Sequence, residues 1–308
     1  MLRDKINELL VDLNTFWSKF EPEYKKSLIS SGEVKRNRST QMSMPELMAI
    51  SISFHMSSYR NFKAYYFEYL NVHCSDIFPK LLSYNRIIEL NPRMILPLSA
   101  YLLSKCNNKC TGINFVDSTT ITVCRNQRIH QHKTFKNSAK RGKSSMGWFF
   151  GFKLHLIINE IGEIISFSLT PGNVDDRNQN VMKRLTKNVY GKLFGDKGYL
   201  SKALSDLLFQ DGIQLITKIK KNMKNTLIPI RDKILLRHRA IIETVNDELK
   251  NISQIEHTRH RSEFGFFVNL VSGLIAYQLK PKKPSLIITE DLDFDQKTES
   301  YPLFLNCA

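Results

Sequence analysis

The hydrophobic period of the chain changes near residue 113, and this change limits the folds open to it. Up to residue 108 apolar residues recur with helical spacing, as in PELMAISISFHM and SYNRIIEL. From Ile113 the run INFVDSTTITV is rich in β-branched residues, and GFKLHLIINEIGEIISFSL forms two alternating segments around a turn at residues 159–162. The sequence therefore predicts a helical segment followed by an α/β domain.

The second part reads as three strands in an antiparallel meander, then alternating helices and strands, then a long helix beginning at Ile230. This order is that of an RNase-H-like domain, with a mixed five-stranded sheet and flanking helices. We expect an all-helical N-terminal domain over residues 1–108, the RNase-H-like domain over 109–280, and an acidic, poorly ordered tail over 281–308.

The charge balance predicts a large anionic partner. The 308 residues include 45 Lys and Arg against 29 Asp and Glu, a formal net charge of +16 with a pI of about 9.6. Nucleic acid is the favoured partner, because the sequence lacks the long apolar segment that a membrane protein needs. The N-terminus lacks the uninterrupted apolar region of a signal peptide, so we expect a cytoplasmic protein.

The five cysteines are an odd and scattered set, which fits a reducing compartment better than a disulfide framework. An alternative is a zinc site built from Cys106, Cys110 and Cys124 with His130 and His132. Their spacing matches no common zinc pattern, so ordinary reduced thiols are the favoured interpretation.

Three carboxylates are candidates for a catalytic site. Asp117 follows the apolar residues Phe115 and Val116 in the first predicted strand, and Asp196 ends the apolar run LFGD of the fourth. These strands are neighbours in the expected layout, so their side chains can converge, and the final helix supplies Glu243, with Asp247 as a weaker rival. Taken singly, each is more often a solvated surface residue.

Such a cluster needs cations between its members, and oxygen ligands suit Mg²⁺ or Mn²⁺. Two ions would serve phosphodiester displacement. Asp176, in the segment TPGNVDDR, is a candidate for a supporting role beside the metals, and a helix cap is the alternative for an acidic residue there.

The motifs DSTT at 117–120, GDKGY at 195–199 and the R-x-x-x-E of Arg239 and Glu243 resemble the DDE transposases of bacterial insertion sequences. More narrowly, SYNRIIEL, RIHQHKTF, GFKLHLIIN and TPGNVDDR resemble the group called insertion sequence nine-eight-two. The resemblance covers roughly residues 40–280, and the order of the motifs is more specific than any one of them.

This resemblance implies that Asp117, Asp196 and Glu243 are the catalytic and metal-binding triad, holding two divalent ions. It implies cleavage of double-stranded DNA at terminal inverted repeats, followed by strand transfer of the 3′-hydroxyl into target DNA. The helical domain would bind the element ends, and the protein would act as a homodimer or larger assembly on DNA, associated with the bacterial nucleoid.

Relatives carry a signature of Tyr, Arg, Glu and Lys, which falls here on Leu236, Arg239, Glu243 and Lys250. The leucine departs from the pattern and leaves open what the tyrosine contributes near the DNA. By this comparison Arg239 and Lys250 would hold phosphate, although Arg239 is equally well explained as a helical ion-pair partner of Glu243.

Basic residues cluster between the first two predicted strands and after the last one, and we expect both groups to contact DNA phosphates. Trp148 is a candidate for base stacking, although a core role is favoured by its aromatic neighbours. The rival functions are a nuclease of the same fold and an inactive DNA-binding regulator or remnant element. The predicted phosphate-binding residues are Lys133, Lys136, Lys140, Arg141, Lys143, Lys220 and Lys221.

Overall fold

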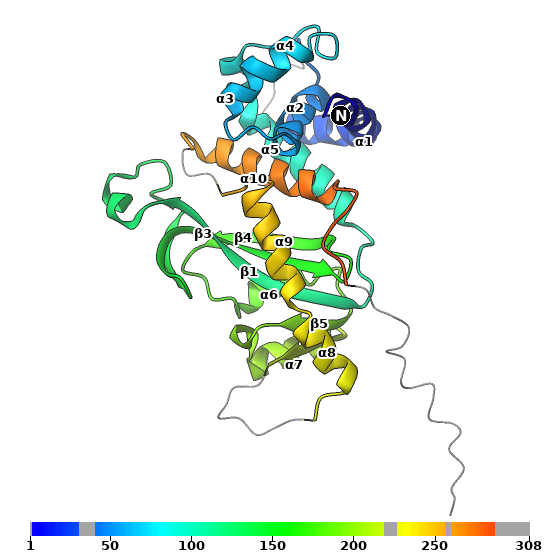
Figure 1. The fold of residues 1–308 in the computed structure, drawn as a ribbon, viewed down its shortest axis with the longest axis vertical. Coiled ribbons are helices and arrows are strands. Elements are labelled where there is room, and N and C mark those ends of the chain that lie inside the picture. The colour runs from blue at the N-terminus through cyan, green and yellow to red at the C-terminus, as the bar shows by residue number, and fades with distance from the viewer. Residues whose placement is uncertain (1, 31–40, 219–226, 257–259, 287–308) are drawn as a thin grey trace, which may run out of the picture.

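The computed structural model describes residues 2–30, 41–218, 227–256 and 260–286. It has an α/β architecture in which a helical layer covers one end of a mixed sheet, and further helices flank the sheet on both faces (Figure 1). The description of the tail ends at residue 286, so the prediction that residues 281–308 are poorly ordered falls mostly outside the described residues. None of the described helices is long and apolar enough to cross a membrane.

The helical layer contains three longer helices from the N-terminal part of the chain. The second begins at a capping box, in which Glu46 N donates to Ser43 Oγ and Ser43 N donates to the Glu46 carboxylate. The layer consists of α1 (Leu2–Ser30), α2 (Met44–Met56), α3 (Phe62–Ala64), a π-helical segment (Tyr65–Leu70), α4 (Asn71–His73) and α5 (Tyr84–Cys106).

Pro92 and Pro97 lie inside α5 and do not end it. Each proline removes one backbone hydrogen bond, but α5 buries residues along its whole length, and this packing offsets the loss.

The last described helix, α10 (Glu263–Gln278), joins the helical layer by packing against α2 and α5. It also touches the sheet, because the Phe266 ring lies 5.1 Å from the Phe152 ring. The division of the chain at residue 108 stays a prediction, and α10 shows that the helical layer draws on both sides of that boundary.

The sheet has six strands in place of the expected five, with β2, β3, β1, β5 and β6 in spatial order. β2 and β4 both pair with the same edge of β3, β2 with residues 147–151 and β4 with residues 152–158. β1, β3 and β4 are antiparallel, as expected, whereas β1, β5 and β6 are parallel. The strands are β1 (Ile113–Cys124), β2 (Lys140–Ser144), β3 (Gly147–Asn159), β4 (Ile164–Pro171), β5 (Gly191–Gly195) and β6 (Ile213–Thr217).

The added strand is β2, a segment that reads as a charged loop in the sequence. Gly142 allows β2 to approach the turn after β4 closely, because a Cβ at this position would lie 2.1 Å from the Gly172 carbonyl oxygen.

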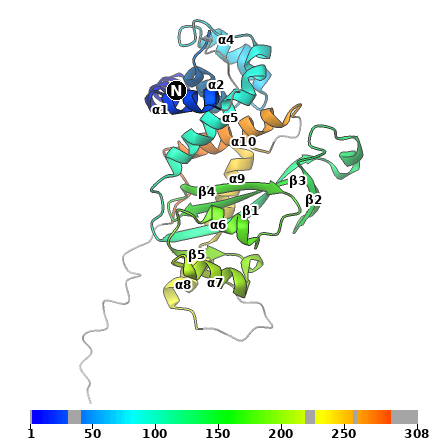
Figure 2. The same cartoon turned by 180° about the vertical axis from the view of Figure 1, so that it is seen from behind.

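Two hydrophobic cores lie on opposite faces of the sheet. One contains Phe115 and Phe194 and faces α9 (Ala240–Asn251), while the other contains Val116 and Leu193 and faces α6 (Gln179–Leu185) and α7 (Lys202–Gln210). Figures 1 and 2 show α9 and α6 on opposite sides of the strands. Side chains alternate faces along a strand, so this division fixes which side each polar residue of β1 points to.

The long helix predicted from Ile230 is broken in two. α8 (Ile230–Arg237) is capped at its C-terminus by His238, and α9 begins at Ala240, with Arg239 as its N-cap. α8 is tied to β5 by an ion pair of 2.7 Å between Lys192 Nζ and the buried Asp232 carboxylate. The break lets α9 take its own direction across the sheet.

The pairing of β1 with β5 is held by Asn114, which is fully buried. Its Nδ2 donates to the carbonyl oxygens of Tyr190 at 2.9 Å and Lys192 at 3.1 Å. On the next residue, the Phe115 ring stacks on Phe194 at 5.5 Å between centroids. These contacts fix the register of the two strands at their beginning.

We expect Asn114→Ala to lower the free energy of unfolding by about 1–3 kcal/mol, because it leaves buried carbonyl groups without their side-chain donor. Asn71→Ala, at an exposed asparagine of α4, should change it by less than about 0.5 kcal/mol. Urea denaturation of the two variants checks this, and equal stabilities would contradict the role assigned to Asn114.

Candidate active site

The register of β1 and β5 places Asp117 and Asp196 side by side. The parallel pairing matches Phe115 with Phe194, and each aspartate lies two residues further along its strand direction. Because side chains alternate with a period of two, both aspartates point to the face of Phe115 and Phe194, which is the α9 face. Asp117 remains within β1, whereas Asp196 directly follows the last residue of β5.

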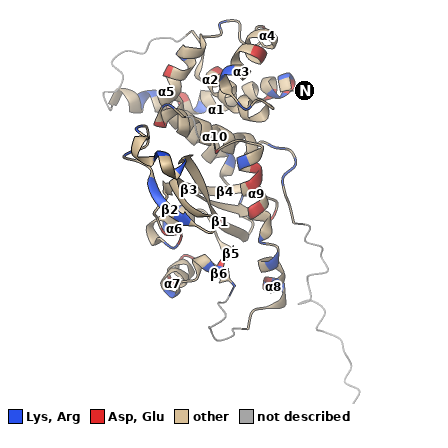
Figure 3. Cartoon of the chain, turned by 60° about the vertical axis from the view of Figure 1, so that its left-hand side comes forward, with Lys and Arg blue, Asp and Glu red and all other residues tan. Residues whose placement is uncertain are grey.

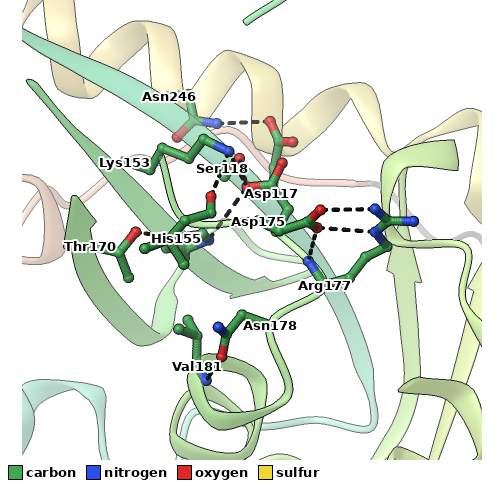
Figure 4. Close-up of polar contacts among 12 residues, drawn as sticks. Asp117, Ser118, Lys153, His155, Thr170, Asp175, Arg177, Asn178, Val181 and Asn246 are labelled. Carbon is green, nitrogen blue, oxygen red and sulfur yellow. Dashed lines mark hydrogen bonds and ion pairs between the residues drawn. The ribbon is translucent and has the colours of Figure 1, made fainter. Parts of the chain in front are cut away.

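Helix α9 brings three polar side chains to Asp117 from the other side. Asn246 Nδ2 donates to Asp117 Oδ2 at 3.1 Å, as Figure 4 shows. Arg239 Nη1 lies 3.8 Å from Asp117 Oδ1, and Arg239 Nη2 forms an ion pair with Glu243. Arg239, Glu243 and Asn246 share one helical face because they are four and three residues apart.

The charge environment of Asp117 reports how close the other carboxylates are. Burial raises the pKa of Asp117 from 3.8 to about 6, against the lowering effect of the Arg239 charge. The negative charges of Glu243 and Asp196 raise this pKa further. Asp196 and Glu243 therefore each lie within electrostatic reach of Asp117, although the three side chains come from separate parts of the chain.

Arg239 stands among these carboxylates. Its side chain is only 13% exposed, and its Nη1 has no hydrogen-bond partner within the described part of the chain. Within the same part, no group of three or more His, Cys, Asp or Glu side chains has an arrangement that could hold a metal ion. The carboxylates share a face, and a guanidinium lies between two of them. The assignment of the triad as metal ligands stays a prediction.

The two alternatives considered for the metal ligands are placed differently. Asp247 accepts a hydrogen bond from Asn251 Nδ2 at 2.6 Å, further along α9. The cysteines Cys74, Cys106, Cys110 and Cys124 are all free thiols, and no zinc cluster involving His130 or His132 occurs among the described residues.

A second polar network lies on the α6 face, directly behind Asp117. Ser118 Oγ donates to Asp176 Oδ1 at 2.8 Å, and Lys153 Nζ reaches the same oxygen at 3.1 Å. His155 is fully buried there, its Nδ1 is 3.9 Å from Asp176 Oδ1, and burial lowers its pKa to about 4. Figure 4 shows its bond to Thr170. Asp176 thus belongs to a network on the opposite face of β1 from Asp117, and Ser118 links the two because it follows Asp117 in the chain.

Neighbouring Asp175 has a different role. Its carboxylate accepts from the backbone and guanidinium of Arg177, and these bonds hold the pKa of Asp175 well below its usual value. The cap of α6 is Asn178, whose side chain accepts from Asn180 N and Val181 N. The helix-cap alternative for the acidic pair is therefore wrong.

Several participants were not singled out in the sequence. Asn246 could have been found from its spacing of three residues from Glu243 on an amphipathic helix. Ser118, Lys153 and His155 carry no comparable signal, because their meeting depends on the register of β1 with β3.

The predicted phosphate-binding residues divide into three groups. Lys140, Arg141 and Lys143 lie on β2, where Figure 3 shows a band of basic residues, and Lys133 and Lys136 are exposed in the segment before it. Lys250 forms an ion pair of 3.2 Å with Glu256, which also accepts from Thr122 N. Lys220 and Lys221 lie outside the described residues. DNA contact by each group stays a prediction.

Leu236, at the position of the signature tyrosine, is buried in the core on the α9 face and is 6% exposed. The departure from the signature therefore replaces a polar aromatic residue by an apolar core residue at this site.

Residues 107–263, just over half of the chain, match the family model described as "Transposase DDE domain". The chain is also similar to a structure described as the cryo-EM structure of a piggyBac transposase synaptic complex with hairpin DNA. That likeness has 10% identity and a TM-score of 0.42, and it covers 83% of this chain and 72% of that chain. No curated protein matches the chain.

We expect Asp117→Asn to stabilise the metal-free protein at neutral pH. In the folded state the Asp117 carboxyl keeps its proton up to a pH of about 6, whereas in the unfolded chain it loses the proton near pH 3.8. The free energy of unfolding of the wild type therefore falls as the pH rises between these values. The asparagine amide carries no charge and has no such pH-dependent cost. The free energy of unfolding of the variant should therefore exceed that of the wild type by on the order of 2 kcal/mol at pH 8.

Urea denaturation in EDTA at about pH 8 and pH 4 measures this difference. The gain should fade toward pH 4, and Asp206→Asn, at an exposed residue of α7, should show no comparable pH dependence. A variant less stable than wild type at pH 8 would show that the Asp117 charge is stabilising.

Proposed function

Because the chain belongs to the family of transposase DDE domains, we propose that it is a metal-dependent DNA transposase of an insertion sequence. It cuts at terminal inverted repeats and transfers the freed 3′-hydroxyl into target DNA. Within the family we assign it to the insertion sequence nine-eight-two group and to an RNase-H-like fold, on the strength of the sequence motifs and of the strand order.

The observation that supports this proposal is the matched position of Asp117 and Asp196, each two residues beyond the paired Phe115 and Phe194. Asp117 lies within β1 and Asp196 directly follows β5, while Glu243 comes from α9 and shares Arg239 with Asp117. The unfavourable charge of Asp196 and Glu243 at Asp117 is the signature of a site that a cation would relieve.

The residues fit a divalent metal by chemistry, since all three are carboxylates and hard oxygen ligands suit Mg²⁺ or Mn²⁺. Asp117, Asp196 and Glu243 would hold it, with two ions as the expected number. When bound, the ions would activate the attacking oxygen and stabilise the leaving oxygen at phosphorus.

The other side chains of the site orient these ligands. Asn246 donates a hydrogen bond to Asp117 Oδ2, and the bond between Ser118 and Asp176 fixes β1 on its opposite face. Arg239 offsets part of the negative charge of the metal-free site through Asp117 and Glu243, and we expect it to turn toward a DNA phosphate when the ions bind.

The partner is double-stranded DNA, both element ends and target. The net charge of +16 and the basic β2 favour contact with phosphates, and the helical layer is our candidate for the part that binds element ends. Pairing two ends requires at least two active sites, so we expect a homodimer or larger assembly on DNA.

We expect Asp196→Asn and Glu243→Gln to abolish cleavage and joining of a labelled duplex that carries an element end, with Mg²⁺ or Mn²⁺. Asp247→Asn is the matched control, because it removes one carboxylate from the same helix and should keep activity close to wild type. Circular dichroism shows whether each variant folds.

The products separate the proposal from its rivals. Cutting without joined products indicates a nuclease, and metal-independent binding without cutting indicates an inactive regulator. Full cleavage by Asp196→Asn or Glu243→Gln would mean that the carboxylates are misassigned.

We expect Arg239→Ala to bind Mn²⁺ more tightly than wild type in the absence of DNA, because a competing cation is removed from between two ligands. Arg237→Ala removes the same charge from the exposed end of α8 and should leave Mn²⁺ affinity nearly unchanged. Calorimetric titration with Mn²⁺ measures both, and weaker binding in Arg239→Ala would refute the competition.

A further inference from the structure

A cleft of about 620 Å³ opens at the end of β5, where Lys153 and Asp176 contribute to its lining, and none of the three candidate carboxylates lines it. Its wall includes Lys197 and Gly198, the two residues after Asp196. On the other side it is bounded by β2 and by the turn between β4 and α6, which supplies Asp176. A ligand in this cleft would therefore lie near the end of β5, against the backbone that follows Asp196.

The cleft is basic. Five of its residues are cationic and two are acidic, and both acidic residues already have cationic partners, since Asp175 binds Arg177 and Asp176 binds Lys153. The remaining cations form no ion pair with any described residue, so their charge is available to an anionic ligand. They are Arg141, Lys143 and Lys197.

One wall of the cleft is an aromatic ring. Trp148 is 54% exposed, with the Arg141 guanidinium 4.8 Å from the ring centroid and Lys143 Nζ at 5.8 Å. The core role favoured for this residue from its neighbours is wrong, because Phe149 and Phe150 are buried while Trp148 is not. An exposed aromatic ring beside unpaired cations is the combination that stacks and holds single-stranded nucleic acid.

Gly198 leaves room where a side chain would fit. A Cβ built there would meet no atom within 4 Å, and its φ is not in the left-handed region. The local backbone therefore does not require glycine at this position. A bare backbone on a cleft wall suits close approach by a ligand.

We propose that this cleft binds one or two unpaired nucleotides of the DNA, with a base on Trp148 and phosphate on Lys143 and Lys197. The volume matches sites for small molecules, which is the size class of one or two nucleotides. The inference rests on the proposed function for the identity of the DNA, but it concerns binding that needs neither metal nor the triad.

The test uses the fluorescence of Trp148 in the full chain. The protein has two tryptophans, and Trp17→Phe leaves Trp148 as the only reporter. In EDTA, a short oligothymidylate should quench this fluorescence, and a duplex with an unpaired overhang should bind more tightly than a blunt duplex.

Trp148→Ala, followed by fluorescence anisotropy of labelled DNA, should reduce the preference for the overhang by roughly 5- to 150-fold, the effect of losing one stacked base. Phe209→Ala is the matched control. Phe209 is 74% exposed on α7, and it lies outside both the cleft and the helical layer. This variant should keep the preference.

Gly198→Leu places a side chain in the cleft and should also weaken overhang binding while leaving blunt-duplex affinity unchanged. Equal quenching by blunt duplex and single strand, or a preference unchanged in Trp148→Ala, would overturn the inference. If that happens while cleavage still depends on Asp196 and Glu243, only the cleft assignment fails. Loss of triad-dependent cleavage with retained overhang binding would overturn the transposase proposal alone.

Discussion

The parallel pairing of β1 with β5 is the constraint on which the candidate site depends. Asn114 bonds to the backbone around the start of β5, and Phe115 stacks on Phe194, so the register is set before either aspartate is reached. A slip of one residue would turn one aspartate to the α6 face, away from its partner. Ordinary core and backbone contacts therefore position two charged groups that repel each other.

That repulsion shapes the surroundings of the site. Burial and two neighbouring carboxylates disfavour the charged form of Asp117, and Arg239 offsets only part of the effect. The site is held in an electrostatically unfavourable state by the rest of the fold, as is common where a protein must bind a ligand of opposite charge. The network of Ser118, Lys153 and Asp176 supports the strand from the opposite face without adding charge to the Asp117 side.

The sequence predicted the change from helices to strands near residue 113, the hairpin at residues 159–162 and the α/β class, because periodicity reports burial directly. It could not predict β2, because these charged residues form a strand only by pairing with the first residues of β3. It could not predict the break after Arg237 either, because no proline or glycine stands there. The three carboxylates stand out by motif, but the cation between them and the cleft beside Asp196 depend on tertiary packing. These arise from side chains that are far apart in the chain and carry no periodic signal.

Helix α10 ties the two ends of the described chain together. It packs on α2 and α5, the Phe266 ring reaches the sheet, and Gln278 bonds to backbone groups of Ile164 and Lys105. A copy of the protein shortened by a premature stop after residue 256 would carry all three carboxylates, yet the apolar faces of α2 and α5 would be left in water. During synthesis, the helical layer that begins the chain must wait for almost the last described segment before it can close. Truncated copies should accordingly be recognised by the cell as unfolded protein, whatever their active-site residues.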